Sequence, residues 1–372
     1  MLFRSAEHVF RPVRYTTAGG VQEDFSYSFH GRIPYAGAYG AGFAETIAQF
    51  LLLFDGTRWA AAPEKRDLLA QFLLHHALWF VEDGHLDMHI VGRVYERLYR
   101  ADAFTEATLL MTQVETPFRK ELEAAARDLL NQGAPVSDVA APFADGLGSG
   151  KTRNLDGFRY WYGSEMGAYK GNGFHVGFRQ YSKRMQDYEY LNYQGPEGWN
   201  LAYGFAYLTR DGTEWFADGS LRPEIDMEFL PATTTRLGAA PINERRTIDD
   251  QGHSLNFGTS GFSGGAGWET GGAAGFILVP AFGDFIAHKS LHFFPQGYWA
   301  LGSGIFSTAR MYEDRPVITP ILQWPVETGA VVRMSNGKHI NSVATKPRTE
   351  ALEWLHVDGI GIAFAEPTEV RM

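Results

Sequence analysis

The chain has 372 residues, of which 45% are hydrophobic and 20% charged, and it contains no cysteine. This length exceeds a comfortable single core, so two domains are expected. A net charge of −10 argues against a general nucleic-acid binder, which would present a basic surface. The sequence has no apolar run long enough to span a bilayer, and disulfides, thiolate zinc sites and a cysteine nucleophile are excluded.

The segment 24–40 places His30 and Tyr39 nine residues apart on a glycine-broken turn. Imidazole exchanges a proton near neutral pH, and a phenol beside a cation can both give and take one. Such a pair suits elimination chemistry. On spacing alone, a histidine beside aromatic residues is more often a structural residue.

Residues 40–135 have the apolar spacing of helices. In 42–54 and 63–80, apolar residues recur at i, i+4 and i+7, and Pro63 stands where a helix begins. Another helix is predicted over 117–130, because Gly133 fits a C-terminal cap. Antiparallel helix pairs are therefore expected in this part of the chain.

Two short segments within this part carry charged or titratable residues. His85 and His89, if helical, could bind zinc, but the glutamate of the metalloprotease motif is absent, which favours structural or surface histidines. Arg93 and Arg97 are predicted to share one helical face, and Gly92 permits the close approach of a ligand or another chain. The alternative is an exposed face with an ion pair to a nearby glutamate.

From residue 134 onward the composition changes. Residues 134–158 are rich in Ala, Pro, Gly, Ser and Asp, and the run 145–152 lacks the first glycine of a phosphate-binding loop. Aromatic and β-branched runs then alternate with turns, and residues 210–213 and 335–338 are hairpin signals. The predicted fold class is α+β multidomain: a helical domain over 1–140, a linker over 141–157 and an antiparallel β domain over 158–372.

Taken together and in this order, the segments resemble polysaccharide lyase family 8, the hyaluronate, chondroitin AC and xanthan lyases. An Asp-x-Ser-Tyr segment leads through a histidine to Tyr-x-Gly-x-Tyr-Gly, which matches the family's catalytic pair with His30 and Tyr39. The family's Gly-Arg-x-x-x-Arg element is matched by Arg93 and Arg97, and its Glu-x-x-Asn element by a later segment.

That later segment contains Glu189 and Asn192, which could supply an acid and an amide at a strand end. Further similarity to the family lies in 231–234, 287–305 and 354–361. The resemblance implies a partial (α/α) toroid followed by a large antiparallel β super-sandwich, with a substrate cleft between them. It also implies β-elimination on a uronic-acid-containing polysaccharide, such as hyaluronan, chondroitin or xanthan, to give unsaturated uronate ends.

The resemblance also implies roles for single residues. Tyr39 would take the C5 proton and protonate the leaving O4, and His30 would assist as a second base or fix the sugar ring. Arg93 and Arg97 would lower the pKa of the tyrosine and bind the anionic sugar, and Glu189 would orient an arginine by a charge-assisted pair. Contacts to the substrate are expected from three residues: Tyr35, Arg97 and Asn192.

Family members carry an upstream asparagine that binds the uronate carboxylate, and this sequence begins after that point. We therefore expect a fragment or a reduced version of a lyase. The resemblance implies an extracellular or periplasmic monomer, although Met1 opens no signal peptide. An acidic polysaccharide is the expected partner, without nucleic acid, membrane, cofactor or metal. The alternatives are a catalytically impaired carbohydrate-binding fragment and a structural or partner-binding protein.

Overall fold

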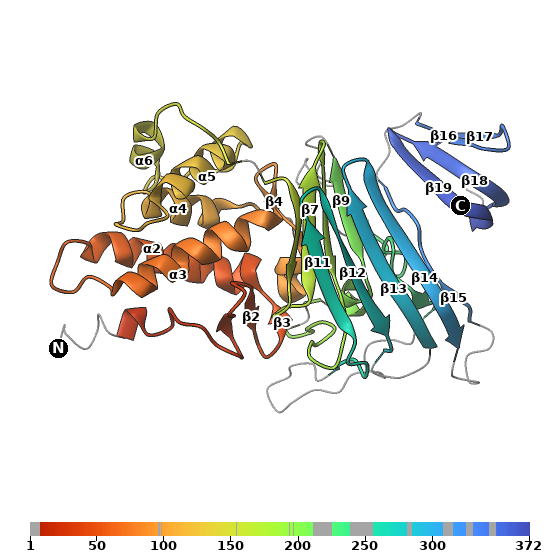
Figure 1. Ribbon diagram of the computed structural model, residues 1–372, viewed down its shortest axis with the longest axis horizontal. Coiled ribbons are helices and arrows are strands. Elements are labelled where there is room, and N and C mark those ends of the chain that lie inside the picture. The colour runs from red at the N-terminus through yellow and green to blue at the C-terminus, as the bar shows by residue number, and fades with distance from the viewer. Residues whose placement is uncertain are drawn as a thin grey trace. The chain divides into compact units, whose positions relative to one another are not determined.

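The structure is a computed structural model that describes the chain except residues 1–7, 96, 98, 154, 193, 196, 211–224, 239–255, 281–284, 308–314, 325–329 and 342–346. The chain divides into two compact units, Met1–Gln323 and Trp324–Met372. Helices gather at one end of the first unit, beside its sheets (Figure 1). The candidate site described below lies entirely in this first unit.

The helical part of the first unit matches most of the predicted helices. Its α-helices are α2 (Ala41–Phe54), α3 (Pro63–His75), α4 (Asp102–Met111), α5 (Arg119–Asn131) and α6 (Ala141–Gly146). The predicted helix 63–80 divides at His76, where φ −136° leaves the helical region, into α3 and the 3-10 turn η2 (Ala77–Phe80). Gly133, with φ +70°, follows α5 as predicted for a C-terminal cap.

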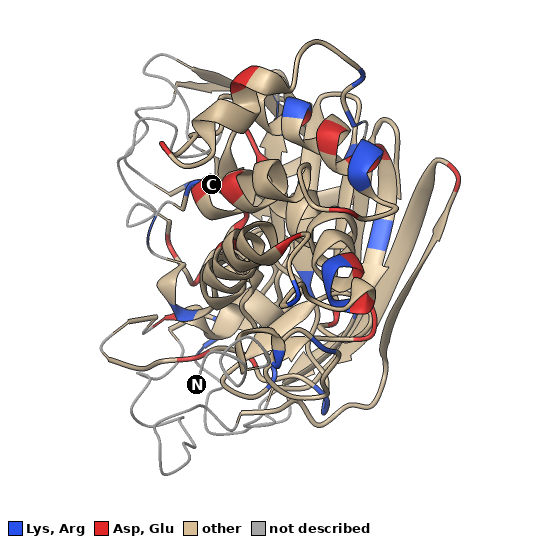
Figure 2. Ribbon diagram, turned by 90° about the vertical axis from the view of Figure 1, so that its left-hand side faces the viewer, with Lys and Arg blue, Asp and Glu red and all other residues tan. Residues whose placement is uncertain are grey.

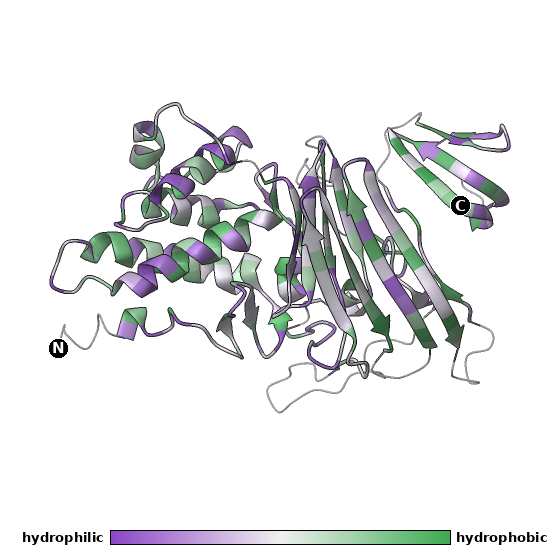
Figure 3. Ribbon diagram, in the orientation of Figure 1, coloured by the Kyte–Doolittle hydropathy of each residue, from purple (hydrophilic) through white to green (hydrophobic). Residues whose placement is uncertain are grey.

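The helix α5 buries one face through Leu122, Ala125, Ala126 and Leu129. Figure 3 shows hydrophilic and hydrophobic residues mixed along α2 and α3. Acidic and basic residues are interspersed over the helical end of the unit in Figure 2. The helix α6 lies inside the segment predicted as a linker, and Phe143 and Leu147 pack against Leu109 and Ala126. None of the described helices is both long and apolar enough to cross a membrane.

Residues 40–133 are mainly helical, as expected, but the segment that contains His85, His89 and Arg93 is not α-helical. This segment forms strands β4 (Val81–Glu82) and β5 (His85–Leu86), followed by the 3-10 turns η3 (Met88–Ile90) and η4 (Gly92–Val94). His85 and His89 therefore share no helical face, and both are buried. Within the described residues, no group of three or more His, Asp or Glu side chains could hold a metal ion.

The strand-rich part consists of antiparallel sheets, as predicted. A small sheet of β1 (Gly20–Val21), β2 (Tyr27–Phe29) and β3 (Ile33–Pro34) precedes α2 and belongs to the helical part. The sheets of the strand-rich part of the first unit are β6 (Gly157–Trp161), β7 (Met166–Gly171), β8 (Phe174–Arg179) and β9 (Ala206–Arg210); β10 (Thr235–Arg236) and β15 (Val317–Ile318); and β11 (Ser263–Trp268), β12 (Gly271–Leu278), β13 (Phe285–Phe294) and β14 (Gly297–Ser307). The second unit holds β16 (Val331–Met334), β17 (His339–Asn341), β18 (Thr349–Val357) and β19 (Ile360–Arg371). The hairpin signal at 335–338 is confirmed by the β16–β17 pair, whereas 211–213 lie outside the described residues.

One hydrophobic core of the first unit lies between sheets β6–β9 and β11–β14. The rings of Phe178 and Phe293 stack with their centroids 5.3 Å apart, and Tyr169 stacks on Phe293 at 5.7 Å. The other buried members of the cluster are Val176, Ala206, Ala232, Ala274 and Leu291. Two sheets that share an apolar layer in this way form a sandwich.

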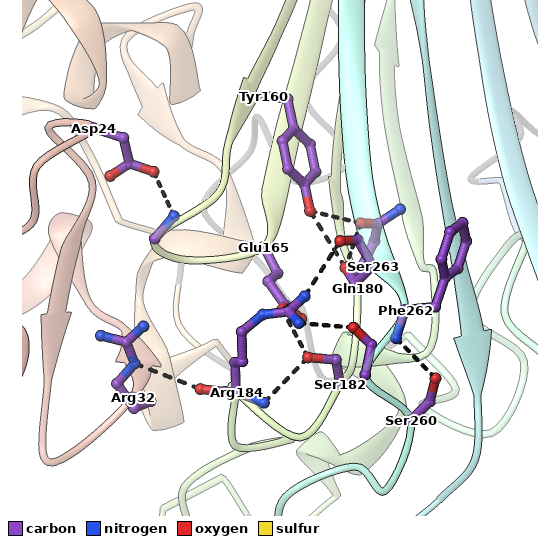
Figure 4. A network of polar contacts seen from close by, with 12 residues as sticks. Asp24, Arg32, Tyr160, Glu165, Gln180, Ser182, Arg184, Ser260, Phe262 and Ser263 are labelled. Atoms are coloured by element: carbon purple, nitrogen blue, oxygen red, sulfur yellow. Dashed lines mark hydrogen bonds and ion pairs between the residues drawn. The ribbon is translucent and has the colours of Figure 1, made fainter.

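Polar side chains tie the β1–β3 segment to the strand-rich part of the unit (Figure 4). Asp24 Oδ2 accepts a hydrogen bond from Gly163 N at 2.5 Å, and Arg32 Nε donates to the Arg184 carbonyl oxygen at 3.5 Å. Arg184 in turn pairs with the buried carboxylate of Glu165 at 2.5 Å. The β2–β3 turn is therefore anchored to residues more than a hundred positions away in the sequence.

The buried His76 should make the stability of this unit depend on pH. Burial lowers the pKa of His76 to about 3, so the folded state holds this ring neutral, whereas an unfolded histidine titrates near pH 6.5. Below that pH the unfolded chain binds more protons, so we expect this histidine to lower the free energy of unfolding by about 1.4 kcal/mol per pH unit between pH 6 and 4.

This expectation is checked by denaturant unfolding at pH 7 and pH 5 of the wild type and of His76→Leu. The variant should lose less stability on acidification, because leucine cannot bind a proton in either state. His8→Leu, at an exposed position, serves as the control and should follow the wild type. Equal losses for all three proteins would contradict the assignment to His76.

Candidate active site

His30 lies in the turn between β2 and β3, where Phe29 pairs with Ile33. Its φ of +49° places it in the left-handed region, which costs a non-glycine residue on the order of 1 kcal/mol and is common at functional sites. Gln186 Oε1 accepts a hydrogen bond from Arg32 N at 2.5 Å. The strand-rich part thus holds the turn that presents His30.

Tyr39 lies on η1 (Ala36–Gly40), a π-helix between β3 and α2, a rare element that often marks functional sites. Its ring lies 4.9 Å from the ring of His30 and 4.4 Å from that of Phe29, between centroids. The ring of Tyr35 is also 4.9 Å away, at an interplanar angle of 74°. Tyr39 is 37% exposed, so its hydroxyl can meet a ligand from solvent.

Arg93, in η4, is the centre of the site. Its Nη1 donates to Glu189 Oε2 at 2.7 Å and to the Tyr35 hydroxyl at 3.1 Å, and its Nη2 donates to the Tyr39 hydroxyl at 3.3 Å. Its Nε donates to Gln194 Oε1 at 3.1 Å. Burial acts to lower the pKa of Arg93, but the hydrogen bonds to Glu189 and Tyr39 outweigh it and raise the pKa, so Arg93 is a permanent cation.

Glu189 is 1% exposed and accepts three hydrogen bonds. The donors are Arg93, the Tyr35 hydroxyl at 2.5 Å and His30 Nδ1 at 2.6 Å. Because this carboxylate is ion-paired with Arg93, Nδ1 of His30 is the protonated ring nitrogen. In the neutral ring, Nε2 then carries the lone pair that can accept a proton.

The structure therefore brings together four residues from distant parts of the sequence. His30 and Glu189 are 159 positions apart, yet their side chains are in contact, and Arg93 links Glu189 to Tyr39. A phenol and an imidazole, one beside a cation and the other beside a carboxylate, can exchange protons with a common ligand. The catalytic roles assigned to these four residues remain predictions.

Of the three other predicted residues, Tyr35 and Arg97 are placed differently from expectation. Tyr35 was expected to contact the substrate, but it is 1% exposed and its hydroxyl is taken up by Arg93 and Glu189. Arg97 shares no helical face with Arg93, because η4 ends at Val94, although its side chain is exposed. Asn192 is also exposed, in a turn where its φ is +55°.

Gln194 was missed by the sequence analysis. It lies two residues beyond Asn192 and supplies the amide oxygen that contacts Arg93 Nε. The available signal was a second amide in the same turn, but only a tertiary contact distinguishes the two side chains. Gly195 follows with φ +72°, and an added Cβ there would lie 2.7 Å from the carbonyl oxygens of Arg93 and Glu189.

Gly92 is the tightest point of the site. An added Cβ would lie 2.0 Å from Cζ of Tyr35, and the φ of Gly92 is +60°. We therefore expect Gly92→Ala to lower the free energy of unfolding by about 1–3 kcal/mol and to displace the Tyr35–Arg93 pair. Denaturant unfolding measures the first effect and a crystal structure the second.

Gly42→Ala is the matched control. Gly42 is exposed in α2, and an added Cβ there meets nothing within 4 Å. Since alanine favours a helix, this substitution should raise the free energy of unfolding by about 0.5–1 kcal/mol. A Gly92→Ala protein as stable as the wild type would show that the close approach to Tyr35 is not required.

Comparison with known protein families agrees with this architecture. Residues 156–372 match the family model described as polysaccharide lyase family 8, super-sandwich domain, and residues 2–121 match that family's N terminal alpha-helical domain. The chain belongs to polysaccharide lyase family 8. The helical domain and the antiparallel super-sandwich expected from the sequence are therefore confirmed.

Several characterised proteins are similar to this lyase-family chain. It is 24% identical to a xanthan lyase of Bacillus sp. (strain GL1) over 88% of the chain and 34% of the relative, and 23% identical to a chondroitinase-AC of Pedobacter heparinus over 100% of the chain and 49% of the relative. The solved structure of a Paenibacillus xanthan lyase superposes with a TM-score of 0.84 at 19% identity, covering 100% of the chain and 36% of that protein. A Streptomyces coelicolor chondroitin AC lyase superposes with a TM-score of 0.73 at 19% identity, covering 96% of the chain and 49% of that protein.

The chain thus spans about a third to a half of the length of these relatives. At this level of identity, the solved structures establish the shared fold.

Proposed function

We propose that this chain carries the catalytic centre of a polysaccharide lyase that cleaves a uronic-acid-containing polysaccharide by β-elimination. The observation that carries the proposal is the hydrogen bond from Arg93 Nη2 to the Tyr39 hydroxyl, at 3.3 Å. The ring of His30 lies beside Tyr39, and Arg93 is ion-paired with the buried carboxylate of Glu189. Family membership supports it, because similar proteins include a xanthan lyase, a chondroitinase-AC and a hyaluronate lyase.

The geometry suits the electron flow of this reaction. A base removes the proton from C5, the C–H electrons form the C4–C5 double bond, the C4–O4 bond breaks, and the leaving oxygen gains a proton. Tyr39, which is exposed, takes the C5 proton as phenolate and returns it to O4. Arg93 Nη2 stabilises the negative charge on the phenolate and in the transition state.

His30 and the exposed polar side chains complete the proposed site. Because the Nδ1–H of His30 donates to Glu189, the Nε2 lone pair can accept a proton from a sugar hydroxyl or hold the sugar ring in place by a hydrogen bond. Arg97 and Asn192 are exposed, so both can contact a polymer, and Arg97 adds positive charge for a uronate. Because the polymer lies outside the cell, we also propose an extracellular or periplasmic site of action.

The test is incubation of the full-length protein with hyaluronan, chondroitin and xanthan. Elimination gives an ultraviolet-absorbing C4–C5 double bond, and the masses of the two products add up to that of the substrate. Products whose masses include an added water would identify a hydrolase instead. Binding of a polymer without cleavage would identify a carbohydrate-binding protein, and either result would overturn the proposal.

A further inference from the structure

Arg93 can donate a hydrogen bond to the Tyr39 hydroxyl only if its guanidinium is held in one orientation. The group is planar, so fixing Nε and Nη1 also fixes the direction of Nη2. In this structure Nε contacts Gln194, Nη1 contacts Tyr35 and Glu189, and Nη2 contacts Tyr39. The contact with Tyr39 thus depends on partners at the opposite edge of the guanidinium.

Resting on the proposed function, we infer that Tyr35 and Gln194 are positioning residues for elimination, which act through Arg93. The Tyr35 hydroxyl makes three hydrogen bonds: it donates to Glu189 Oε2 at 2.5 Å and accepts from Arg93 N at 3.0 Å and from Nη1 at 3.1 Å. One hydroxyl therefore joins the backbone and the side chain of Arg93 to the carboxylate that pairs with it.

The chemistry of Tyr35 agrees with a positioning role. Burial, reinforced by the neighbouring Glu189, raises the pKa of Tyr35, so its phenol remains protonated. Its side chain is 1% exposed, whereas Tyr39 is 37% exposed. Tyr35 therefore keeps its donor hydrogen for Glu189, and Tyr39 is the tyrosine that a substrate can reach.

Gln194 is held by its own turn. Its backbone N–H donates to the Leu191 carbonyl oxygen at 3.1 Å, and Leu191 N–H donates back to the Gln194 carbonyl oxygen at 3.3 Å. The next residue, Gly195, packs directly against the backbone of Arg93 and Glu189. The amide side chain is therefore presented to Nε from a closed turn.

The first test compares Tyr35→Phe with Tyr27→Phe, a control at another buried tyrosine, whose ring packs on Phe43 and Phe72. Because a small misplacement of a catalytic group is costly, Tyr35→Phe should lower kcat about 10²-fold and leave KM nearly unchanged. It should also shift the pH at which kcat/KM is half-maximal. Equal kcat values and pH profiles for the two variants would overturn the inference.

The second test asks whether Tyr35 acts through Arg93. In an Arg93→Ala background, Tyr35→Phe should change kcat by less than about twofold, because the partner it positions is gone. Additive losses would overturn the inference. Gln194→Glu, which keeps an acceptor for Nε, should retain more activity than Gln194→Leu, and equal losses in these two variants would remove Gln194 from the role.

Crystal structures of Tyr35→Phe and Gln194→Leu separate this inference from the proposed function and also decide the matter if Arg93→Ala does not fold. We expect Nη2 of Arg93 to move away from the Tyr39 hydroxyl in each variant. If Nη2 of Arg93 stays within about 3.5 Å of the Tyr39 hydroxyl in both variants, the positioning role is wrong even for an active lyase. If the wild type cleaves no uronate polymer, the proposed function fails, while these structures still decide whether Tyr35 and Gln194 orient Arg93.

Discussion

Replacement of Tyr39 by phenylalanine should lower the kcat for elimination by about 10²–10⁴-fold, because it removes the group that takes and returns the proton. The fold should be unaffected. The ring still packs on Phe29 and His30, and the lost hydroxyl is at a partly exposed position whose contact is with Arg93. The rate is measured by the ultraviolet absorbance of the new double bond, and the stability by denaturant unfolding.

Tyr162→Phe is the matched control for this experiment. Tyr162 is 61% exposed and lies outside the site, just after β6, so its replacement should change neither kcat nor stability. Full activity of Tyr39→Phe would remove this tyrosine from the mechanism. A large loss of stability in Tyr39→Phe would show that its hydroxyl serves the fold instead.

The second large effect is expected at Glu189. Its carboxylate is 1% exposed and pairs with Arg93 at 2.7 Å, so Glu189→Ala leaves a largely buried guanidinium without a counter-charge. Removal of one member of such a pair typically lowers the free energy of unfolding by about 3–5 kcal/mol. Activity should fall as well, because His30 and Arg93 both lose the group that orients them.

Glu189→Gln separates the charge from the shape of this side chain. It keeps the volume and an acceptor oxygen but loses the negative charge, so it should be more stable than Glu189→Ala and still strongly impaired in kcat. Glu197→Gln, at an exposed position in the same region, should behave like the wild type. A Glu189→Gln protein with wild-type stability and kcat would show that the ion pair with Arg93 has no role.

The link between the two parts of the first unit has a consequence for function. His30, Tyr39 and Arg93 come from the helical part, whereas Glu189 and Gln194 come from the strand-rich part. Their hydrogen bonds cross the boundary between these parts. Formation of the site therefore depends on the same contacts that hold the helical part against the sheets. A substitution that breaks these contacts should disturb both the site and the packing of the two parts.

The sequence by itself determined the elements whose signal is local. Apolar periodicity predicted α2 and α3, because the apolar residues of a helix that buries one face recur every three to four residues. Pro63 marked the first residue of α3. Ser335 to Lys338 predicted a hairpin, because Gly337 can adopt φ +78° in the tight turn. The order of the motifs, as a resemblance, identified His30, Tyr39, Arg93 and Glu189.

Only the tertiary structure decided how these residues meet. The helical face expected for Arg93 and Arg97 is absent because Gly92, at φ +60°, turns the chain so that Arg93 lies against Tyr35. Tyr35 and Tyr39 are equivalent by sequence pattern, yet one is buried under the ion pair and the other is exposed. Local periodicity carries no information about a contact across 101 residues, such as that between Arg93 and Gln194, because such a contact depends on how the separately formed elements pack.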